Sequence, residues 1–456
     1  MPKLNTKVGW LAFTEFALGV LAVQVAAFVR FGWDLPTETE GPLLWVRAAV
    51  FGTAVVVALT AMGLYQLRQR LEIEGVLIRM VLALLLAAAA LALVYYVAPP
   101  LRLWRGWWGL SFVFAAVFLC AGRLAFARLA DQEVFRRRVV VYGAGKRAGT
   151  LLELRRRSDQ RGFNLLAFMP VPGETHLVTD PRVDCNATGV EELVRKYDAD
   201  EVVVAMDDRR RNFPIRELLD CKLSGIHVVD ALTFLERESG KVKIDLLDPS
   251  WLIFSEGFTQ RTKSGNLLRV FDIAVSILVL LVAWPFMILT ALAILLEDGR
   301  PVLYRQVRVG LMGKEFELLK FRSMTKNAEQ GGARWAERND SRVTRVGSLI
   351  RKLRLDELPQ LFNVLKGDMR LIGPRPERPE FVRVLCERIP YYHERHCVKP
   401  GLTGWAQLSY PYGSSEKDAL EKLQFDLYYV KNQSLLFDLM ILLQTVEVVI
   451  WGKGAR

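Results

Sequence analysis

Two neighbouring carboxylates, Asp356 and Glu357, are the side chains in this sequence best suited to chemistry. Cationic residues surround the pair: Arg342, Arg345, Arg351, Lys352 and Arg354 precede it, and Lys366, Arg370 and Arg375 follow it. Nearby positive charge favours the ionised form of a carboxyl group. Such a site can attract a polyanion, hold a divalent metal and present one carboxylate as a nucleophile toward phosphorus. A surface helix rich in ion pairs is the alternative.

Composition indicates a membrane protein with more than one domain. The chain has 456 residues, 52% of them hydrophobic, a mean hydropathy of +0.19 and a net charge of +12. A length of this order exceeds one typical domain. The positive charge suits phosphate-rich ligands or an anionic lipid leaflet. Long apolar segments and the lack of a recognisable nucleic-acid module predict no nucleic-acid partner. The five cysteines are scattered without C-x-x-C spacing, as expected of reduced cytoplasmic thiols.

Four apolar stretches open the chain, at residues 8–29, 43–66, 80–98 and 107–127. Each has about the 20 residues that a membrane-spanning helix needs. Lysine and arginine cluster before the first stretch, between the second and third, and after the fourth. Because basic loops stay in the cytoplasm, we expect a four-helix transmembrane bundle over residues 1–130 with both ends cytoplasmic. Arg47, Arg102 and Arg105 are exceptions to this distribution, and Glu15 is expected to face a partner helix.

A Rossmann-like α/β domain is predicted for residues 136–250. The run R-V-V-V-Y-G-A-G-K-R-A-G indicates a buried strand, a glycine loop with Gly143, Gly145 and Gly149, and a helix. Further alternating strand and helix patterns indicate a doubly wound sheet. The G-x-G-x-x-x-G spacing is looser than the dinucleotide fingerprint, and no acidic residue closes the second strand. A structural or regulatory role is therefore favoured over dinucleotide binding.

A fifth apolar segment, residues 267–296, is long enough to span a membrane but is expected to be re-entrant. Pro285 lies past its middle, where proline removes a backbone hydrogen bond and bends a helix. Arginines and lysines flank the segment on both sides, which predicts that both flanks are cytoplasmic. A helix that enters one leaflet, breaks at Pro285 and returns fits both facts. A kinked span is the alternative, and it would export the basic half of the chain.

The motifs that follow resemble those of the bacterial sugar transferase family. These motifs are D-E-L-P-Q, G-P-R-P-E, K-P-G-L-T-G-W-A-Q and F-D-L-Y-Y-V, and the resemblance covers residues 265–452 in order. Members are polyprenyl-phosphate hexose-1-phosphate transferases, also called monotopic phosphoglycosyl transferases. The resemblance implies a mainly α monotopic catalytic domain with the re-entrant helix over residues 262–456. Four spans and a Rossmann-like domain ahead of it are similar to the long form of the family, a multi-domain membrane protein.

The resemblance also implies a reaction. Asp356 matches the nucleophile and Glu357 its partner at a Mg²⁺ site. The enzyme would transfer a hexose-1-phosphate from a UDP-sugar to undecaprenyl phosphate, through a covalent phosphosugar-aspartate, and release UMP. This is the first membrane step of exopolysaccharide or O-antigen synthesis, on the cytoplasmic face of the bacterial inner membrane. Glucose or galactose is the expected sugar.

Further roles follow from the same resemblance. Arg375, in the P-R-P element, matches a phosphate-binding arginine, and its planar fork suits bidentate contact with phosphate. Lys320, Arg322 and Arg354 are expected to be further phosphate contacts, and Pro285 corresponds to the break in the membrane helix. The chain departs from the family pattern twice. Trp284 stands in place of a serine before Pro285, and Arg354 replaces the serine of S-L-D-E.

Other polar residues leave alternatives open. Trp405 and Gln407 either help to shape the donor site, or Gly401 and Gly404 only make a turn and Trp405 fills core. A structural role is favoured for Asp426, and His393, His396 and Cys397 are expected to pack rather than bind metal. A membrane-bound nucleotide-sugar dehydratase would need Tyr-x-x-x-Lys, whose only match, Tyr142 to Lys146, lies in the glycine loop. A non-catalytic membrane scaffold for polysaccharide assembly would not need Asp356. The spans and the Rossmann-like domain could also serve as contacts in a homodimer.

Overall fold

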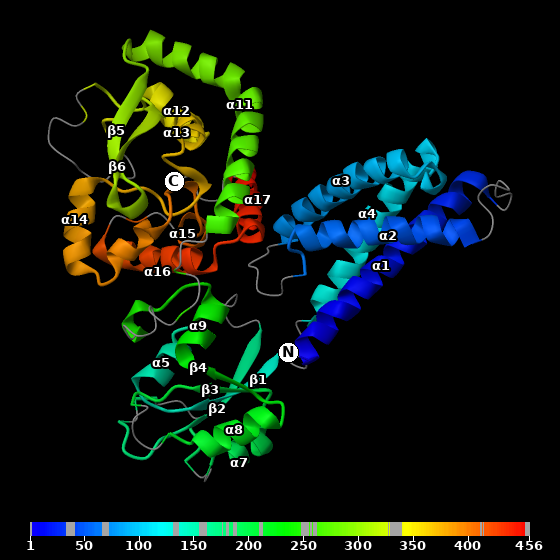
Figure 1. The fold of residues 1–456 in the computed structure, drawn as a ribbon, viewed down its shortest axis with the longest axis vertical. Coiled ribbons are helices and arrows are strands. Elements are labelled where there is room, and N and C mark those ends of the chain that lie inside the picture. The colour runs from blue at the N-terminus through cyan, green and yellow to red at the C-terminus, as the bar shows by residue number, and fades with distance from the viewer. Residues whose placement is uncertain are drawn as a thin grey trace. The chain divides into compact units, whose positions relative to one another are not determined.

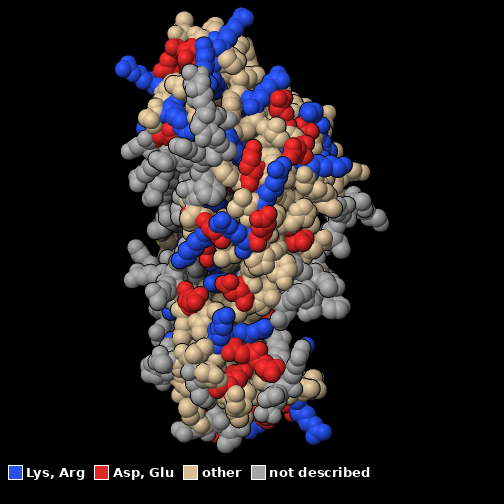
Figure 2. Space-filling view, turned by 90° about the vertical axis from the view of Figure 1, so that its left-hand side faces the viewer, with Lys and Arg blue, Asp and Glu red and all other residues tan. Residues whose placement is uncertain are grey.

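The structure is a computed structural model that divides into two compact units, Met1–Ser239 and Gly240–Arg456. It describes residues 2–32, 42–65, 73–130, 136–154, 162–175, 177–178, 182–185, 189–208, 213–247, 255, 258, 262–326, 328, 340–410, 413 and 415–451. Most of these residues are helical, and Figure 1 shows the helices and sheets of each unit. On the face drawn in Figure 2, acidic and basic side chains are interspersed rather than gathered by sign.

The first unit begins with four long apolar helices, α1 (Pro2–Phe31), α2 (Pro42–Ala61), α3 (Ile73–Val97) and α4 (Arg105–Ala130). By length and composition each can cross a membrane. Helix α1 packs against α2 and α4, and α2 packs against α3. The residues form long helices because leucine and alanine dominate the stretches and proline is confined to their ends. Several apolar helices thus confirm the prediction of a membrane protein.

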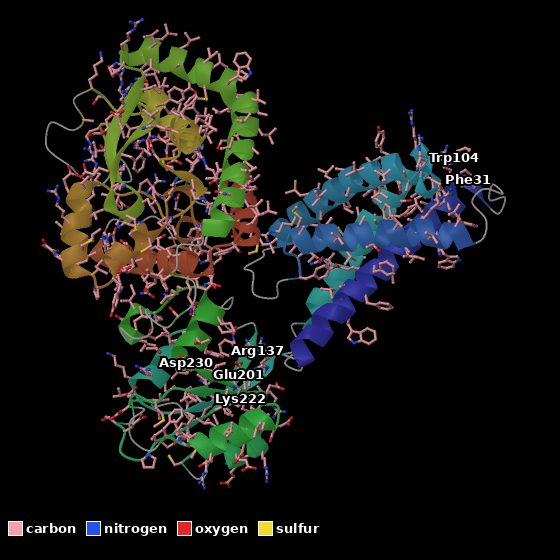
Figure 3. The ribbon with its side chains drawn as sticks, in the orientation of Figure 1. Phe31, Trp104, Arg137, Glu201, Lys222 and Asp230 are labelled. Carbon is pink, nitrogen blue, oxygen red and sulfur yellow. The ribbon has the colours of Figure 1, made fainter. Side chains whose placement is uncertain are left out.

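Polar and aromatic contacts join α1 to α4. The carboxylate of Glu15 pairs with the guanidinium of Arg123 at 2.7 Å. Glu15 therefore faces a partner helix, as the sequence predicted. At the other end of α1, the ring of Phe31 lies edge-on to Trp104 and Trp107, with centroids 6.4 and 6.0 Å away (Figure 3). Edge-to-face aromatic pairs contribute beyond their buried area, so this end of the two helices is well packed.

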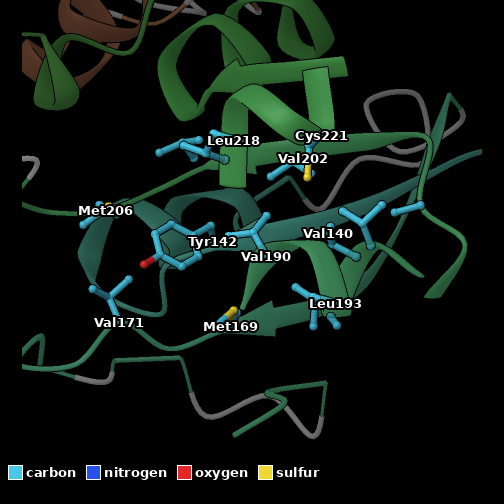
Figure 4. Packing of buried hydrophobic residues seen from close by; sticks show 14 residues of the cluster. Val140, Tyr142, Met169, Val171, Val190, Leu193, Val202, Met206, Leu218 and Cys221 are labelled. Carbon is cyan, nitrogen blue, oxygen red and sulfur yellow. The ribbon is translucent and has the colours of Figure 1, made fainter. Parts of the chain in front are cut away.

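A small parallel sheet completes the first unit. Its strands are β1 (Arg137–Tyr142), β2 (Phe163–Met169), β3 (Glu201–Val204) and β4 (His227–Asp230), in the order β2-β1-β3-β4. Its helices are α5 (Lys146–Leu152), α7 (Val190–Tyr197), α8 (Ile215–Leu223) and α9 (Ala231–Ser239). Apolar side chains of α7 and α8 pack on one face of the sheet (Figure 4), and α5 contacts α9. Parallel strands buried between helices need near-continuous apolar runs, such as V-V-V in β1.

Arg137, the first residue of β1, pairs with a buried carboxylate of the neighbouring strand β3. Arg137 pairs with the buried carboxylate of Glu201 at 2.8 Å, and Arg237 pairs with the same carboxylate at 2.6 Å (Figure 3). Buried charges need such partners because desolvation is costly. Arg137 therefore joins β1 to β3 and, through Glu238, to α9.

The second unit combines one long helix, two small sheets and several short helices. Helix α11 (Thr262–Asp298) is followed by the antiparallel pair β5 (Leu303–Val309) and β6 (Glu315–Phe321). Strand β7 (Arg370–Ile372) pairs in parallel with β8 (Gly401–Thr403). The remaining helices are α12 (Arg345–Lys352), α13 (Gln360–Lys366), α14 (Pro379–Arg388), α15 (Trp405–Ser409), α16 (Glu416–Asn432) and α17 (Leu435–Trp451). Short 3-10 turns are η4 (Ile244–Leu246), η5 (Leu311–Gly313), η6 (Leu355–Glu357) and η7 (Tyr392–Cys397).

Helix α11 carries Pro285 inside one continuous helix. Figure 1 shows the helix changing direction along its length. Proline removes one backbone hydrogen bond and its ring presses on the preceding turn, but the bonds on either side persist. The helix therefore continues through Pro285, where the sequence predicted a break. By composition its residues Gly265–Asp298 are also long and apolar enough to cross a membrane.

Charged contacts tie both ends of α11 to the rest of the unit. Near its start, Arg269 donates to the carbonyl oxygens of Val364 and Leu365, which lie in the last turn of helix α13. Near its end, the Glu297 carboxylate accepts hydrogen bonds from the backbone N–H groups of Arg345 and Val346. A carboxylate at a helix N-terminus satisfies free N–H groups and complements the helix dipole. Helix α11 thus positions α12 and α13, which flank η6.

Arg370 joins three elements at the centre of the unit. Its guanidinium pairs with Asp272 of α11 and with Asp438 of α17, each at 2.8 Å. The Tyr429 hydroxyl of α16 donates to Asp438 at 2.8 Å and lies 3.1 Å from the carbonyl oxygen of Ile372. Asp272 is 1% exposed and Asp438 is fully buried. The network therefore attaches helices α11, α16 and α17 to β7.

Replacing Arg370 with glutamine should strongly destabilise the second unit. The change leaves two buried carboxylates without a cation, and breaking a buried ion pair costs about 3–5 kcal/mol. Arg305→Gln is the matched control, because its pair with Glu317 is exposed and worth at most about 1 kcal/mol. Thermal unfolding in detergent would compare the two variants. Equal melting temperatures would contradict the prediction.

Candidate active site

Asp356 and Glu357 lie on η6, between helices α12 and α13. Thr344 caps α12 through its hydroxyl, which accepts from the Gly347 N–H. An apolar cluster of Ile294, Phe321 and Ile350, with Leu355 packed against it, seats this region on α11 and β6. Arg354 adopts a left-handed conformation with φ of 58° just before η6. Non-glycine residues seldom adopt this conformation, which here reverses the chain sharply so that both carboxylates follow at once.

Glu357 is held by cations from three elements. Its Oε1 accepts a hydrogen bond from Arg375 at 2.8 Å and lies 3.8 Å from the Lys320 ammonium of β6. Its Oε2 lies 3.6 Å from Arg354. Burial would raise the pKa of Glu357, but Arg375 and Lys320 outweigh burial and hold the pKa down at about 2. Glu357 is therefore a permanent anion that orients the cations around it.

Asp356 has a different environment. Within the described part of the chain, its carboxylate accepts no hydrogen bond and makes no ion pair, although its side chain is half-buried. Burial and then the adjacent charge of Glu357 raise its pKa, against the opposing effect of Lys320 and Arg351. Cations thus lower the pKa of both carboxyl groups, as the sequence predicted, but at Asp356 burial and the charge of Glu357 outweigh them. A more basic carboxylate with uncommitted lone pairs is the better nucleophile.

Arg375 lies in a loop that follows β7. The Gly373 N–H donates to the Thr403 carbonyl oxygen, and the Gly401 N–H donates to that of Pro374, so the loop rests on β8. A Cβ on Gly401 would lie 2.0 Å from the Gly373 nitrogen, so these glycines permit the close approach. One nitrogen of Arg375 contacts Glu357, and another donates to the Gln407 side chain of α15 at 3.3 Å. The P-R-P and G-W-A-Q motifs therefore meet at one arginine.

The structure gathers three of the four predicted phosphate contacts. Lys320, Arg354 and Arg375 surround Glu357, whereas Arg322 lies at the end of α11. There Arg322 pairs with Asp298 at 3.0 Å and donates to the carbonyl oxygens of Asp298 and Gly299. These contacts satisfy carbonyls that a helix end leaves without partners. Contact of Arg322 with phosphate stays a prediction, and its present contacts are structural.

The glycine loop of the first unit binds a carboxylate from the same domain through its backbone N–H groups. The Asp207 carboxylate, beyond β3, accepts from the backbone N–H groups of Lys146 and Arg147, both at 2.8 Å. A Cβ on Gly145 would lie 2.2 Å from this carboxylate, and one on Gly143 would lie 2.5 Å from the Ala205 oxygen. These two glycines are thus needed for close packing, in line with a structural role for the loop. Gly149 has no such neighbour.

Arg395, which was not predicted from the sequence, holds the backbone of Arg375 by a hydrogen bond. Arg395 donates to the Arg375 carbonyl oxygen at 2.9 Å and to the Tyr392 hydroxyl at 2.6 Å. It also pairs with Asp426 at 2.8 Å. In H-E-R-H-C the flanking histidines are the more conspicuous candidates, but His396 is a buried residue whose ring lies beside Tyr392. Asp426 could have indicated Arg395 from the sequence, because a carboxylate on an apolar helix face needs a cation as its partner.

Known proteins resemble this chain over much of its length. A family model described as bacterial sugar transferase matches residues 264–452. An Aeromonas hydrophila UDP-N-acetylgalactosamine-undecaprenyl-phosphate N-acetylgalactosaminephosphotransferase is 42% identical over 270 residues, 57% of this chain and 61% of that relative. A Salmonella typhimurium undecaprenyl-phosphate galactose phosphotransferase is 31% identical over 376 residues, 76% and 75% of the two chains. An Escherichia coli UDP-glucose:undecaprenyl-phosphate glucose-1-phosphate transferase is 32% identical over 372 residues, 78% and 76%.

The family model and the named relatives all describe transferases, so this protein is a transferase. The chain belongs to the bacterial sugar transferase family, the polyprenyl-phosphate hexose-1-phosphate transferases. The family and the enzyme class predicted from its motifs are therefore confirmed.

Transferase activity should fall above a pH of about 8 because Lys320 loses its proton. Burial, and then the charge of Arg375, lower the pKa of Lys320 to about 8, despite the opposing carboxylates. Below that pKa the ammonium is charged, and above it the site loses one cation. Lys320→Arg should abolish this alkaline decline, because a guanidinium stays protonated.

The pH profile of initial rates would measure this effect. Lys366→Arg is the matched control, since Lys366 is an exposed residue whose ammonium pairs with Asp368 and with neither of the two site carboxylates. It should keep the wild-type profile. An alkaline decline unchanged in Lys320→Arg would contradict the assignment.

Proposed function

We propose that the enzyme transfers a hexose-1-phosphate from a UDP-sugar to undecaprenyl phosphate and releases UMP. The observation that carries the proposal is the contrast between two neighbours. Asp356 has a carboxylate without a partner in the described structure, whereas Glu357 is engaged by Arg375 and Lys320. The names of the relatives, which specify undecaprenyl phosphate together with glucose, galactose or N-acetylgalactosamine, support the same substrates.

Asp356 would act as the nucleophile of a two-step displacement. One carboxylate oxygen attacks the β-phosphorus, and the bond from that phosphorus to the oxygen bridging it to the α-phosphate breaks. UMP leaves with the bridging oxygen, and an acyl phosphate joins the phosphosugar to Asp356. A phosphate oxygen of the polyprenyl acceptor then attacks the same phosphorus and frees the carboxylate. Covalent catalysis thus divides one difficult displacement into two.

The cations around Glu357 would stabilise the negative charge that develops on phosphate oxygens. Arg375 offers a planar fork that suits two oxygens, and Lys320 adds a compact charge beside it. Glu357 keeps both cations in place before substrate arrives, so little reorganisation is needed during reaction. This role differs from that of Asp356, which touches the reacting phosphorus.

Asp356 and Glu357 would also hold a Mg²⁺ ion. Both supply carboxylate oxygens, the hard ligands that Mg²⁺ prefers, and Asp356 has its oxygens uncommitted. No third metal-ligating side chain joins them among the described residues, which fits an ion that usually takes one or two carboxylates and completes its shell with substrate phosphates and water. When bound, such an ion supplies charge neutralisation at the diphosphate.

The membrane setting completes the proposal. We infer that helices α1 to α4 form a transmembrane bundle, that the four-stranded sheet is a Rossmann-like domain, and that α11 is re-entrant. Basic residues on both flanks of α11 support the last point, because both flanks then stay in the cytoplasm. The site would face the cytoplasm at the inner membrane, where a soluble UDP-sugar and a lipid phosphate can meet. Glucose or galactose is the proposed sugar.

Asp356→Asn should lower UMP release about a thousandfold or more, because the amide cannot attack phosphorus. Purified enzyme would be assayed with Mg²⁺, undecaprenyl phosphate and a panel of UDP-sugars. Asp368→Asn, a nearby carboxylate paired with Lys366, is the matched control and should stay active. Failure of wild type to release UMP with every donor, or undiminished release by Asp356→Asn, would refute the proposal.

Incubation with the UDP-sugar alone should attach one hexose phosphate to Asp356. Without an acceptor the second step cannot occur, so the intermediate accumulates to at most one per chain. Intact-protein mass spectrometry and peptide mapping would measure the adduct. UMP release that requires the acceptor from the outset, with no adduct at Asp356, would exclude the covalent route.

A further inference from the structure

A short segment, Gly240–Leu247, packs into the catalytic unit although it precedes the residues that match the family model. We call it the strap. It follows helix α9 directly and contains η4. Val242 is fully buried, and Ile244 lies in the same apolar core, which includes Leu385 of α14 and Leu423 of α16. The strap is therefore an integral part of the second unit.

Polar contacts attach the strap to helices α15 and α16. The Trp405 indole N–H donates to the Gly240 carbonyl oxygen at 2.7 Å. The Val242 N–H donates to the Gln424 carbonyl oxygen at 3.0 Å, and Lys241 pairs with Glu421 at 2.6 Å.

Glycine is required where the strap meets Trp405. Gly240 has a φ of +64°, a left-handed conformation that side chains disfavour. A Cβ at this position would lie 3.2 Å from Cζ2 of the Trp405 ring. The backbone therefore approaches the indole as closely as it does because no side chain intervenes.

The first route from the strap reaches the side chain of Arg375. Trp405 is the first residue of α15, a five-residue helix. Gln407, in the same helix, accepts from the Arg375 guanidinium at 3.3 Å. Because α15 is so short, a shift of Trp405 moves Gln407 with it.

The second route reaches the backbone of Arg375. Gln424 of α16, which the strap contacts, lies close to Asp426 along the same helix. Asp426 pairs with Arg395, and Arg395 donates to the Arg375 carbonyl oxygen at 2.9 Å. Asp426 is 2% and Arg395 6% exposed, so this pair is shielded from water and is costly to disrupt.

We propose that the strap is a positioning element of the active site, which sets the place of Arg375 through both α15 and α16. The inference rests on the proposed function, in which Arg375 binds the donor diphosphate. A guanidinium must be held within a fraction of an ångström to favour the transition state. The strap also continues the chain of the preceding sheet domain, so the link that joins this domain to the enzyme is itself part of the support of the phosphate site.

Gly240→Ala and Trp405→Phe test the strap in the full-length protein. Both should change donor kinetics by about 3- to 30-fold, the range expected of coupled residues without substrate contact, chiefly as a raised KM for the UDP-sugar. Gly225→Ala is the matched control for the first, because Gly225 has a φ of +88° and an added Cβ would meet no heavy atom within 4 Å. It imposes a similar backbone penalty without touching Trp405, and should leave KM unchanged.

A double-mutant cycle separates positioning from general destabilisation. In an Arg375→Lys background the effect of Trp405→Phe should largely vanish, because the fork that Gln407 orients is gone. Val382→Ala, a core change in α14, should lower the melting temperature without this coupling. Additive effects of Trp405→Phe and Arg375→Lys, or an unchanged KM in both strap variants, would overturn the proposal.

The two proposals fail in different ways. If wild type releases no UMP with any donor, the proposed function falls. The strap is then tested by the rise in melting temperature that UDP induces. A rise that is smaller in Trp405→Phe than in wild type supports the strap, and an equal rise overturns it.

Discussion

One buried cation, Arg370, is the constraint on which the second unit depends. It pairs with both Asp272 and Asp438, which come from helices near the beginning and the end of the unit's sequence. Neither carboxylate can leave the cation without becoming an unpaired charge in an apolar interior. Because Arg370 opens β7 and the strand leads directly into the loop with Arg375, the same network fixes where that loop begins.

Two adjacent carboxylates differ in chemistry because their surroundings differ. Glu357 faces Arg375 and Lys320, and their charge outweighs the effect of burial on its pKa. The pKa of Asp356 is raised, first by burial and then by the negative charge of Glu357. One residue is thereby a fixed anion that organises cations, and the other is a more basic group with uncommitted oxygens. Such a separation of environments is how a protein assigns distinct roles to identical functional groups.

Support for the site extends well beyond the residues that surround the carboxylates. Arg375 is held at its side chain by Gln407 and at its backbone by Arg395. Gln407 belongs to α15 and Arg395 pairs with Asp426 of α16, and the strap contacts both of these helices. Enzymes need such outer contacts because the position of a functional side chain is fixed by the residues that pack against it and hydrogen-bond to it.

Much of the architecture was predictable from local sequence. Hydropathy located the five long apolar helices, and alternating patterns located the parallel sheet. Pro285 predicted a break in α11, but the structure keeps one continuous helix through the proline. Motif residues Lys320, Arg354 and Arg375 do gather at Glu357. Arg322 lies instead at the end of α11, where the carbonyl oxygens of that helix compete for it.

The sequence by itself determined which segments are apolar helices, where a glycine loop follows a buried strand, and which residue types form the candidate site. These properties depend on each residue and its neighbours along the chain. Only the tertiary structure decided that Glu357 is paired while Asp356, within the described residues, is not, and that Arg395 and Gln407 support Arg375. Charge pairing and pKa depend on distances through space between segments that are far apart in sequence. Residue spacing does not contain those distances.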